Sequence, residues 1–310
     1  MINLLYCFDS NYNFQAFTSI YSFLNNTKEK LNIYVIHKDE SNKKIFPDKI
    51  LNHKNLSQLN LYKFDRKFTK FPNVKNSHVS EATYYRIFFD SYIEDVNDLK
   101  TLVYVDSDMV CISNPFSEIK KYENDLLKSK YIISAKTEDL SDSEKKTIFN
   151  NLELTSGKYL NAGFLIIDVA KWTNKNIPSE LINKIVEIED KIIYWDQDVF
   201  NSYFDGLYLE LPNSLNTDTE LESKNLINKN SLILHYYGKT KPWNTKGILN
   251  NKSKYYQDSF RLLGLGSYHV THKRRILSIK QLLYGLVTLR IFNIYKPISF
   301  IKEFISSLFR

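Results

Sequence analysis

Apolar and polar positions alternate along the chain in a pattern that predicts β-strands separated by helices. The first apolar run, residues 2–8 (INLLYCF), is rich in residues that favour β-structure and predicts the first strand. Phe14, Phe17, Tyr21 and Leu24 recur at helical spacing and predict an amphipathic helix. We also expect strands at 31–36, 60–64, 101–105, 131–135, 164–167, 207–211 and 231–236, helices at 43–59 and 81–93, and a polar stretch near 65–78. Strands that alternate with helices indicate an α/β sheet with crossover connections.

The pattern changes near Gly264-Leu265-Gly266, where we expect a body (residues 1–265) to give way to a C-terminal segment (266–310). Residues 272–292 and 298–309 each place apolar side chains on one helical face, which predicts a helical segment. The longest uncharged run in that segment is nine residues, Gln281 to Leu289, and it is too short to span a bilayer.

The net charge of +7 belongs to the C-terminal segment. Residues 267–310 hold eight lysines or arginines and one acidic residue, Glu303, whereas the rest of the chain holds 34 bases and 34 acids. We therefore expect no nucleic-acid partner for the body. Basic, aromatic, amphipathic helices instead indicate a segment that lies on an anionic membrane surface. Packing on the body or on a second subunit, as in a homo-oligomer, is the alternative.

Two features bear on the compartment. Cys7 and Cys111 lie in or beside apolar runs, at a spacing that suits neither zinc nor a disulfide framework, so we expect buried free thiols. The pattern of a signal peptide does not precede the first strand. These features predict a cytoplasmic protein, peripheral on the inner face of the membrane.

Two carboxylates, Asp106 and Asp108, follow the buried strand at 101–105. Residues i and i+2 of an extended segment share a face, so both side chains can point into one crevice. Like charges repel there unless a cation separates them, and a divalent cation with oxygen ligands can also hold a diphosphate. Ligands of open α/β sheets bind beyond the carboxyl ends of the strands. A solvated turn would give the same pattern, as would a haloacid-dehalogenase-type phosphatase with Asp106 as nucleophile.

Three further polar segments each allow a structural and a functional interpretation. Residues 9–12 (DSNY) end the first strand, where they would cap the next helix or meet a nucleobase and ribose. Asn161 would be a turn residue or bind a sugar hydroxyl, and Gly163 would start a strand or permit close backbone approach. Residues 196–198 (DQD) would begin a helix, or bind sugar hydroxyls and stabilise an oxocarbenium-like transition state.

The most distinctive segment is HYYGKTKPW, residues 235–243, directly after an apolar run. A lone histidine at a strand end is usually structural, but the neutral imidazole of His235 can complete a metal site begun by two aspartates. Lys241 can neutralise a phosphate, and Gly238 lets the backbone approach it. Together these segments supply metal ligands, phosphate charge and sugar-binding groups.

These motifs, in this order, resemble the retaining glycosyltransferases of family eight, the group that includes glycogenin and bacterial lipopolysaccharide galactosyltransferases. The matching elements are FDSNY, ATYYR at 82–86, YVDSDMV, LNAGFLIID, YWDQD and LHYYGKTKPW, which span residues 2 to about 244. The resemblance implies a GT-A fold, a single Rossmann-like nucleotide-binding domain with a mixed, mostly parallel sheet. It also implies a UDP-sugar donor and a Mn²⁺ or Mg²⁺ ion.

Site residues follow from the same resemblance. Asp106, Asp108 and His235 would be the metal ligands. The donor would contact Asp9, Asn11, Tyr12, Arg86, Asp106, Ser107, Gly238 and Lys241, and the sugar would lie among Asn161, Asp196, Gln197 and Asp198.

We expect transfer of glucose or galactose to a hydroxyl of a lipid-linked, protein-linked or polysaccharide acceptor, with retention of configuration. Gln197 would lie beneath the anomeric carbon, and a covalent intermediate through Asp196 is left open. The phosphatase interpretation weakens because about a hundred residues precede Asp106 and the chain contains no Gly-Asp pair. A sugar-binding protein without activity is the other alternative.

Overall fold

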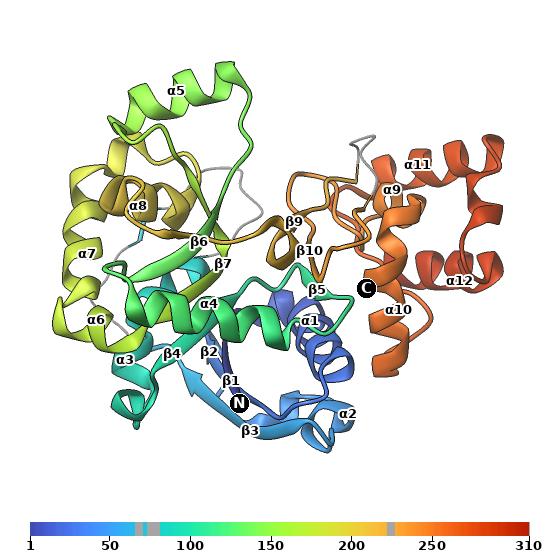
Figure 1. The fold of residues 1–310 in the computed structure, drawn as a ribbon. Helices are drawn as coiled ribbons and strands as arrows, with labels where there is room; N and C mark the ends of the chain where they lie inside the picture. Colours follow the sequence, from blue (N-terminus) through green and yellow to red (C-terminus); the bar gives the residue numbers. More distant parts are fainter. Residues whose placement is uncertain (66–70, 73–80, 222–226, 310) are drawn as a thin grey trace.

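The computed structural model describes residues 1–65, 71–72, 81–221 and 227–309, and these residues form a central seven-stranded sheet (Figure 1). The strand order is β3-β2-β1-β4-β7-β6-β8. Its strands are β1 (Ile2–Phe8), β2 (Leu31–His37), β3 (Leu56–Lys63), β4 (Thr101–Val105), β6 (Ile133–Thr137), β7 (Leu160–Asp168) and β8 (Leu209–Glu210). All neighbouring pairs are parallel except those of β7, which runs antiparallel to β4 and β6. The sheet is therefore mixed and mostly parallel, as expected.

The order of the strands creates a crevice at one edge of the sheet. From β1 the chain adds β2 and β3 on one side, and then returns to pair β4 with the other side of β1. A crevice opens beyond the carboxyl ends of two parallel strands where the direction of winding reverses. The residues that follow β1 and β4, Asp9 and Asp106, lie at this point.

Helices cover both faces of the sheet because its strands are apolar on both sides. One apolar cluster includes Val103 and Val105 of β4 and residues of α1 (Asn13–Asn26), α2 (Asp48–Leu51) and α4 (Phe116–Lys128). A second cluster includes Leu102 and Tyr104, from the opposite side of the same strand. It is completed by residues of α3 (Phe89–Tyr92), α5 (Asp142–Leu152), α6 (Val169–Asn174), α7 (Ile177–Glu187) and α8 (Trp195–Phe204).

A smaller sheet lies beside the crevice. In the described part of the chain it comprises β5 (Met109–Cys111), β10 (Ile233–His235) and β9 (Thr217–Asp218), in that order. β10 pairs antiparallel with β5, so that His235 lies opposite Met109, and it pairs parallel with β9. Because β5 begins directly after Asp108, the turn from Asp106 to Asp108 joins the two sheets.

Two predicted helices differ from the structure. Residues 43–59 contain a 3₁₀ turn (Lys43–Ile45) and the short α2, and β3 begins at Leu56 instead of residue 60. Pro47 explains the break, because the residue before a proline is pushed into extended conformation, and Phe46 has ψ 138°. Residues 81–93 form a 3₁₀ helix (Glu81–Phe88) that continues into α3.

Other expectations differ less. The strand expected at 231–236 is β10 of the smaller sheet. Because β7 starts at Leu160, Asn161 lies in a strand instead of a turn, and Gly163 lies inside that strand instead of at its start. The polar stretch expected near 65–78 lies mostly outside the described residues.

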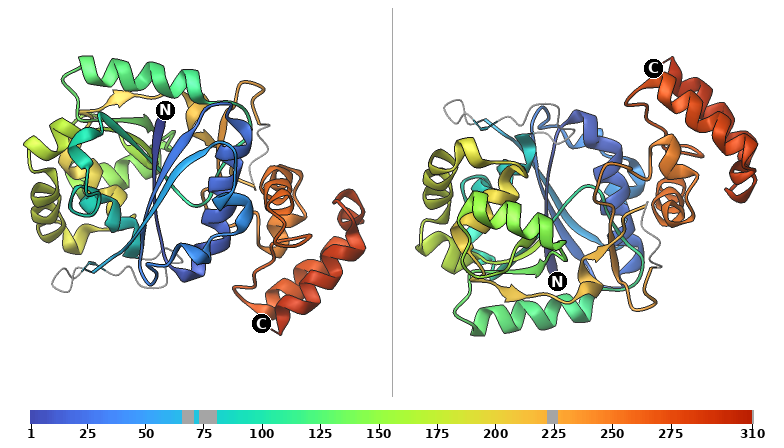
Figure 2. Two further views of the ribbon diagram at one scale, coloured as in Figure 1. Left: turned by 90° about the horizontal axis from the view of Figure 1, so that it is seen from below. Right: turned by 90° about the horizontal axis from the view of Figure 1, so that it is seen from above.

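The C-terminal segment forms a helical layer on the smaller-sheet side of the molecule (Figures 1 and 2). Helices α9 (Thr245–Ile248) and α10 (Lys254–Leu263) lead to it, and Gly264 ends α10 with φ +87°, a conformation that favours glycine. Helices α11 (Arg275–Val287) and α12 (Pro297–Leu308) follow. They pack through an apolar cluster made of Ile248, Tyr268, Ile291, Phe300 and Phe304. Within the described ranges, none of the helices is long and apolar enough to cross a bilayer.

Candidate active site

The two carboxylates after β4 project from a turn at the crevice. The amide of Met109 donates a hydrogen bond to the carbonyl of Asp106 (3.2 Å), and the amide of Asp106 donates to the carbonyl of Gly163 on β7 (2.8 Å). The expectation of an extended Asp106–Asp108 segment is therefore wrong, because this i to i+3 hydrogen bond closes a turn. Both carboxylates nevertheless face the same space.

His235 completes a cluster with both aspartates. One ligand atom from each of Asp106, Asp108 and His235 lies within 4.8 Å of the other two. His235 Nε2 is 3.3 Å from Asp108 Oδ1 and 4.0 Å from Asp106 Oδ2. Asp108 Oδ1 is buried and accepts no hydrogen bond from the described residues. A buried carboxylate oxygen without a donor, beside an imidazole nitrogen and a second carboxylate, fits the ligand set of a divalent cation.

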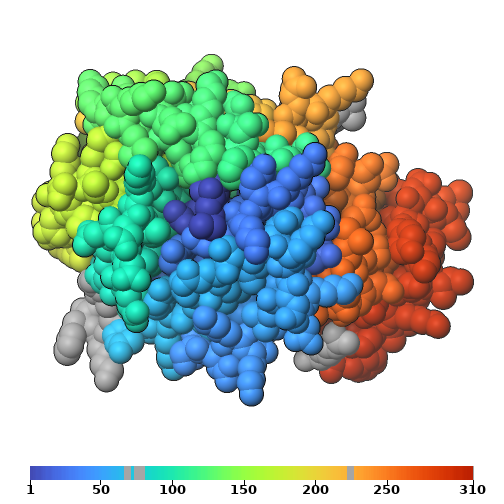
Figure 3. All heavy atoms as spheres, turned by 60° about the horizontal axis from the view of Figure 1, so that its bottom comes forward, coloured from blue at the N-terminus to red at the C-terminus, as the bar shows by residue number. Residues whose placement is uncertain are grey.

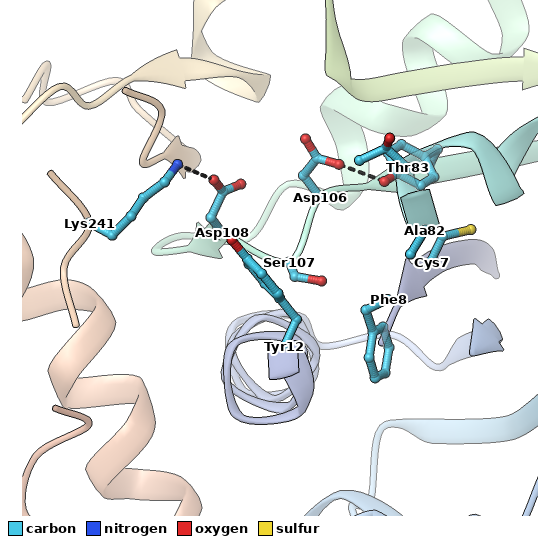
Figure 4. A pocket seen from close by; sticks show the side chains of 10 residues that line it. Cys7, Phe8, Tyr12, Ala82, Thr83, Asp106, Ser107, Asp108 and Lys241 are labelled. Carbon is cyan, nitrogen blue, oxygen red and sulfur yellow. Dashed lines mark hydrogen bonds and ion pairs between the residues drawn. The ribbon is translucent and has the colours of Figure 1, made fainter. Parts of the chain in front are cut away.

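Lys241 adds a positive charge to this cluster. Its Nζ lies 2.7 Å from Asp108 Oδ2 and 2.8 Å from the carbonyl of Tyr236. Figure 4 shows the side chains of Lys241 and Asp108 pointing toward each other across the pocket. Burial raises the pKa of Asp108, but Lys241 and His235 outweigh this effect and hold that pKa well below its usual range. Asp108 is therefore ionised and available as a ligand.

Arg86 links the cluster of Asp106, Asp108 and His235, which we call the metal-type cluster, to the predicted sugar site. Its side chain is 2 % exposed, with Nε 2.9 Å from Asp196 Oδ2 and Nη2 3.4 Å from Asp106 Oδ1. The guanidinium lies 3.7 Å above the ring centroid of Tyr104. Burial raises the pKa of Asp196 to about 6, although Arg86 opposes that shift.

A pocket of about 90 Å³ lies at the carboxyl ends of β1 and β4 (Figure 4). Phe8, Tyr12, Ser107, Asp108 and Lys241 are among its lining residues. The structure thus brings Tyr12 and Ser107 to the crevice, as predicted.

Asp9 and Asn11 lie beside this pocket in sequence, but neither is among its lining residues in the described part of the chain. The carboxylate of Asp9 instead accepts a hydrogen bond from the amide of Asn11 (2.9 Å) and caps the 3₁₀ turn Ser10–Tyr12. Asp9 thus has a capping role, the alternative that the sequence left open, but it caps this 3₁₀ turn and not the helix α1, whose N-cap residue Tyr12 makes no side-chain capping bond.

A larger cavity of about 420 Å³ adjoins the metal-type cluster. It brings together nine of the predicted site residues, namely Arg86, Asp106, Asp108, Asn161, Asp196, Gln197, His235, Gly238 and Lys241. Gly238 has φ +81°, so the backbone turns here in a conformation that glycine adopts readily.

Gly163 provides space for the metal-type cluster. A Cβ atom at this position would lie 2.5 Å from His235 Cε1 and 3.0 Å from Asp106 Oδ2. The glycine therefore permits close approach of side chains to β7, one of the two roles that the sequence suggested.

Gln197 and Asp198 occupy different environments although they are adjacent. Gln197 lines the cavity, and its Oε1 accepts a hydrogen bond from the amide of Ala162 (3.0 Å). Asp198 lies behind the cavity wall, where it accepts hydrogen bonds from the hydroxyl of Tyr159 (2.5 Å) and the amides of Ile193 (2.6 Å) and Tyr194 (2.7 Å). These bonds hold the turn before Trp195, which has φ +54°.

Several polar residues near the cavity were not predicted, and Glu138 and Asn216 are two of them. Glu138, directly after β6, accepts a hydrogen bond from Asn161 Nδ2 (2.7 Å), and Asn216, before β9, contacts both Asn161 and His235. Both residues lie in ordinary polar stretches of the sequence. The only sequence signal for a site role would have been their position, since Glu138 directly follows the strand β6 and Asn216 directly precedes the strand β9.

Comparison with known proteins agrees with this architecture. The galactosyltransferase LgtC, solved in complex with donor and acceptor sugar analogues, superposes with a TM-score of 0.68 at 17% identity, covering 89% of this chain and all of that chain. The chain therefore has a GT-A-type glycosyltransferase fold.

Sequence comparison then gives the family. The model of glycosyl transferase family 8 matches residues 3–247, so the chain belongs to this family. It is 28% identical to lipopolysaccharide 1,2-glucosyltransferase of Escherichia coli (83% of this chain, 76% of the relative). It is 27% identical to lipopolysaccharide 1,3-galactosyltransferase of Salmonella typhimurium (79% of this chain, 74% of the relative). Family membership replaces the phosphatase interpretation of Asp106.

Proposed function

We propose that the protein is a metal-dependent, retaining hexosyltransferase that moves glucose or galactose from a UDP-sugar to a hydroxyl of a glycan acceptor. One observation carries the proposal: Asp106, Asp108 and His235 converge at the crevice, within reach of Lys241 and beside the cavity lined by Gln197. The relatives' names include both a glucosyltransferase and a galactosyltransferase, so both donors are retained.

The donor would lie across the two pockets. Uridine would occupy the smaller pocket near Tyr12 and Ser107, with Asp9 and Asn11 at its edge. Asp106, Asp108 and His235 would hold Mn²⁺ or Mg²⁺, which when bound would neutralise the diphosphate and the charge that grows on it as UDP leaves. Lys241 and the backbone at Gly238 would hold the same phosphates.

The reaction would take place in the larger cavity. The bond between the anomeric carbon and the UDP oxygen breaks, and the electron pair leaves with UDP. The acceptor hydroxyl would form the new bond on the same face, and its proton would pass to the departing diphosphate oxygen. Gln197 would lie beneath the anomeric carbon and stabilise the positive charge there, because an amide is a poor nucleophile. Asn161 and Asp196 would bind sugar hydroxyls, and Asp198 would hold the turn that carries Gln197.

One experiment separates the candidate functions. UDP-glucose and UDP-galactose are incubated with the full chain, with and without Mn²⁺, and UDP release is measured before and after addition of acceptor sugars. Metal-dependent UDP release supports the transferase. Binding of the donor without UDP release, even with acceptor sugars present, would favour a sugar-binding protein. Hydrolysis of p-nitrophenyl phosphate without UDP release would favour the phosphatase.

We also propose that the C-terminal segment (266–310) lies on an anionic membrane surface, so that the protein is cytoplasmic and peripheral on the inner face of the membrane. On α11, four apolar side chains at helical spacing are exposed, namely Ile276 (74%), Ile279 (40%), Leu283 (55%) and Val287 (84%). Near them a pocket of about 200 Å³ is lined by Lys246, Lys280, Arg290 and Tyr284. Apolar side chains flanked by bases suit acyl chains and phosphate headgroups.

A membrane location would favour a lipid-linked or cell-envelope glycan as the acceptor. Flotation with vesicles that contain phosphatidylglycerol, at low and high salt, tests it. Failure to bind at low salt would contradict the membrane proposal without affecting the transferase. Self-association through the exposed face of α11, seen as a dimer by light scattering, would favour the homo-oligomer instead.

A further inference from the structure

A chain of four polar residues, three of them buried, connects the larger cavity to the metal-type cluster. It runs from Glu138 through Asn161 and Asn216 to His235, with donor–acceptor distances of 2.7, 2.9 and 3.1 Å. The residues come from the end of β6, from β7, from the segment before β9 and from β10. Asn216 has no exposed surface, and Asn161 and His235 are also buried, so water does not compete for the two bonds among these three residues, whereas Glu138 is only partly buried.

The orientation of Asn161 follows from its fixed partners. The amide of Gly163 can only donate, and it lies 2.9 Å from Asn161 Oδ1. The carboxylate of Glu138 accepts at the other end of the same side chain. Asn161 therefore presents its oxygen, and not its nitrogen, to Asn216.

The orientation of Asn216 then follows from that of Asn161. Because Asn161 Oδ1 is an acceptor, the atom of Asn216 that faces it is the donor Nδ2, at 2.9 Å. The remaining atom, Asn216 Oδ1, lies 3.1 Å from His235 Nδ1 and accepts a hydrogen bond from it. His235 thus carries its proton on Nδ1, and the neutral ring directs the lone pair of Nε2 toward Asp108 and Asp106.

We infer that Asn216 is a positioning residue that selects the metal-binding tautomer of His235 and, through Asn161, ties that ring to the sugar cavity. The inference rests on the proposed function, since it assigns Nε2 of His235 to the cation. Outer partners that fix the tautomer of a ligating histidine typically change metal affinity 10- to 100-fold when they are removed. The Nδ2 group of Asn216 also donates to Asn161 Oδ1. The oxygen of the Asn216 side chain therefore acts on the metal ligand His235, and its nitrogen acts on the sugar cavity.

Two substitutions at Asn216 separate the role of its oxygen from the role of its nitrogen. Asn216→Leu has a similar size and removes both hydrogen bonds, so we expect Mn²⁺ affinity to fall at least tenfold. Asn216→Asp keeps an acceptor for His235 Nδ1 but cannot donate to Asn161. We therefore expect this variant to keep at least one third of the wild-type affinity for Mn²⁺. Its affinity for the UDP-sugar should fall tenfold more than its affinity for UDP.

The measurement is the concentration of free Mn²⁺ by electron paramagnetic resonance, which needs no turnover, followed by titration with UDP, UDP-glucose and UDP-galactose. Thr217→Val is the matched control. Thr217 is buried next to Asn216, and its hydroxyl donates to the carbonyl of Asn213 (2.7 Å), away from His235. This variant should lose stability but keep both affinities.

Two results would overturn the inference while leaving the proposed function intact. The first is a folded Asn216→Leu variant that binds Mn²⁺ within twofold of the wild type. The second is an Asn216→Asp variant that loses as much Mn²⁺ affinity as Asn216→Leu. If the wild-type chain binds neither Mn²⁺ nor Mg²⁺, both the inference and the metal site of the proposed function are overturned. The titration of the wild-type chain, done before any variant is made, gives this result.

Discussion

The crevice beside β4 and the C-terminal segment both depend on charge, but they hold it in opposite ways. At the crevice, Asp106, Asp108 and Asp196 are matched by Arg86, Lys241 and His235 within 4.0 Å. The C-terminal segment forms one side of the molecule (Figure 3). It holds eight bases and one acid, and apolar side chains of its helix α11 are exposed.

The difference determines how each region responds to change. A buried charge that loses its partner keeps its full desolvation cost, so single substitutions at the crevice should have large and local effects. An exposed charge is screened by salt, and its contribution adds to those of its neighbours. Binding at the crevice should therefore depend on the exact positions of a few charged groups, whereas binding by the C-terminal segment should depend on how many charges it carries.

The largest effect should come from Asp108→Asn. It removes one ligand and the ionic partner of Lys241, so we expect Mn²⁺ affinity and metal-dependent donor binding to be lost, while circular dichroism shows a folded chain. Asp258→Asn changes an exposed acid of α10 that pairs with Arg261 and serves as the control. Equal Mn²⁺ affinity in both variants would remove Asp108 from the metal site.

Gln197→Ala should come next. Loss of an oriented amide beneath the anomeric carbon should lower kcat about 100- to 1000-fold, the range found when one group that stabilises transition-state charge is removed. UDP affinity should stay nearly unchanged, because Gln197 lines the larger cavity and not the smaller one. Gln58→Ala, on β3, is the control, and full turnover in Gln197→Ala would contradict the assignment.

In the C-terminal segment, Lys273→Gln, Arg274→Gln and Arg275→Gln together should weaken binding to anionic vesicles about 100-fold, since each base near the surface contributes about 1 kcal/mol. UDP release from free UDP-sugar should not change. Replacing three exposed lysines of the body, Lys43, Lys44 and Lys54, tests whether position or total charge matters. Equal losses of vesicle binding in the two triple variants would show that binding depends on total charge and not on the C-terminal segment.

A smaller effect is expected from Gly163→Ala. The new methyl group would displace His235 or Asp106 by a few tenths of an ångström or more, so we expect Mn²⁺ affinity to fall roughly tenfold, as for other disturbances of ligand placement. Gly157→Ala is the control: a Cβ there meets no atom within 4 Å, although its φ of +71° costs about 1 kcal/mol of stability. A Gly163→Ala variant with normal affinity would mean that the site adjusts without loss.

The most gradual effect is that of pH. Burial lowers the pKa of His235, but the charges of Asp108 and Asp106 outweigh burial and raise it above its usual range. A raised pKa means that the proton competes with the cation at neutral pH, so Mn²⁺ affinity should rise with pH and fall by up to about tenfold per unit below that pKa. Titrations from pH 6 to 8 check this, and a flat profile would exclude a histidine ligand.

The motifs of the sequence predicted the strands that end at the crevice, because apolar runs and the polar residues that follow them are both local signals. The same logic placed Asp106, Asp108 and His235 in one site. It failed where tertiary contacts decide, as at residues 56–59, where pairing with β2 makes a strand of a stretch with helical spacing.

The sequence also left out residues whose role depends on distant partners. Asn216 acts through Asn161 and His235, which lie 55 and 19 residues away in the chain. Asp198 has the composition of a sugar-binding group, yet its carboxylate is engaged by the Tyr159 hydroxyl and two backbone amides. Neither fact can be derived from the spacing of residue types.

The contact between Lys241 and Asp108 joins positions 133 residues apart in the chain. Contacts of such long sequence separation form late in folding, since the entropy of closing the intervening loop opposes them until most of the chain is in place. We expect a refolding chain to regain helical content first and the ability to bind Mn²⁺ only in its last kinetic phase. Ion binding would then report that β1, β4, β7 and β10 have all reached their native positions.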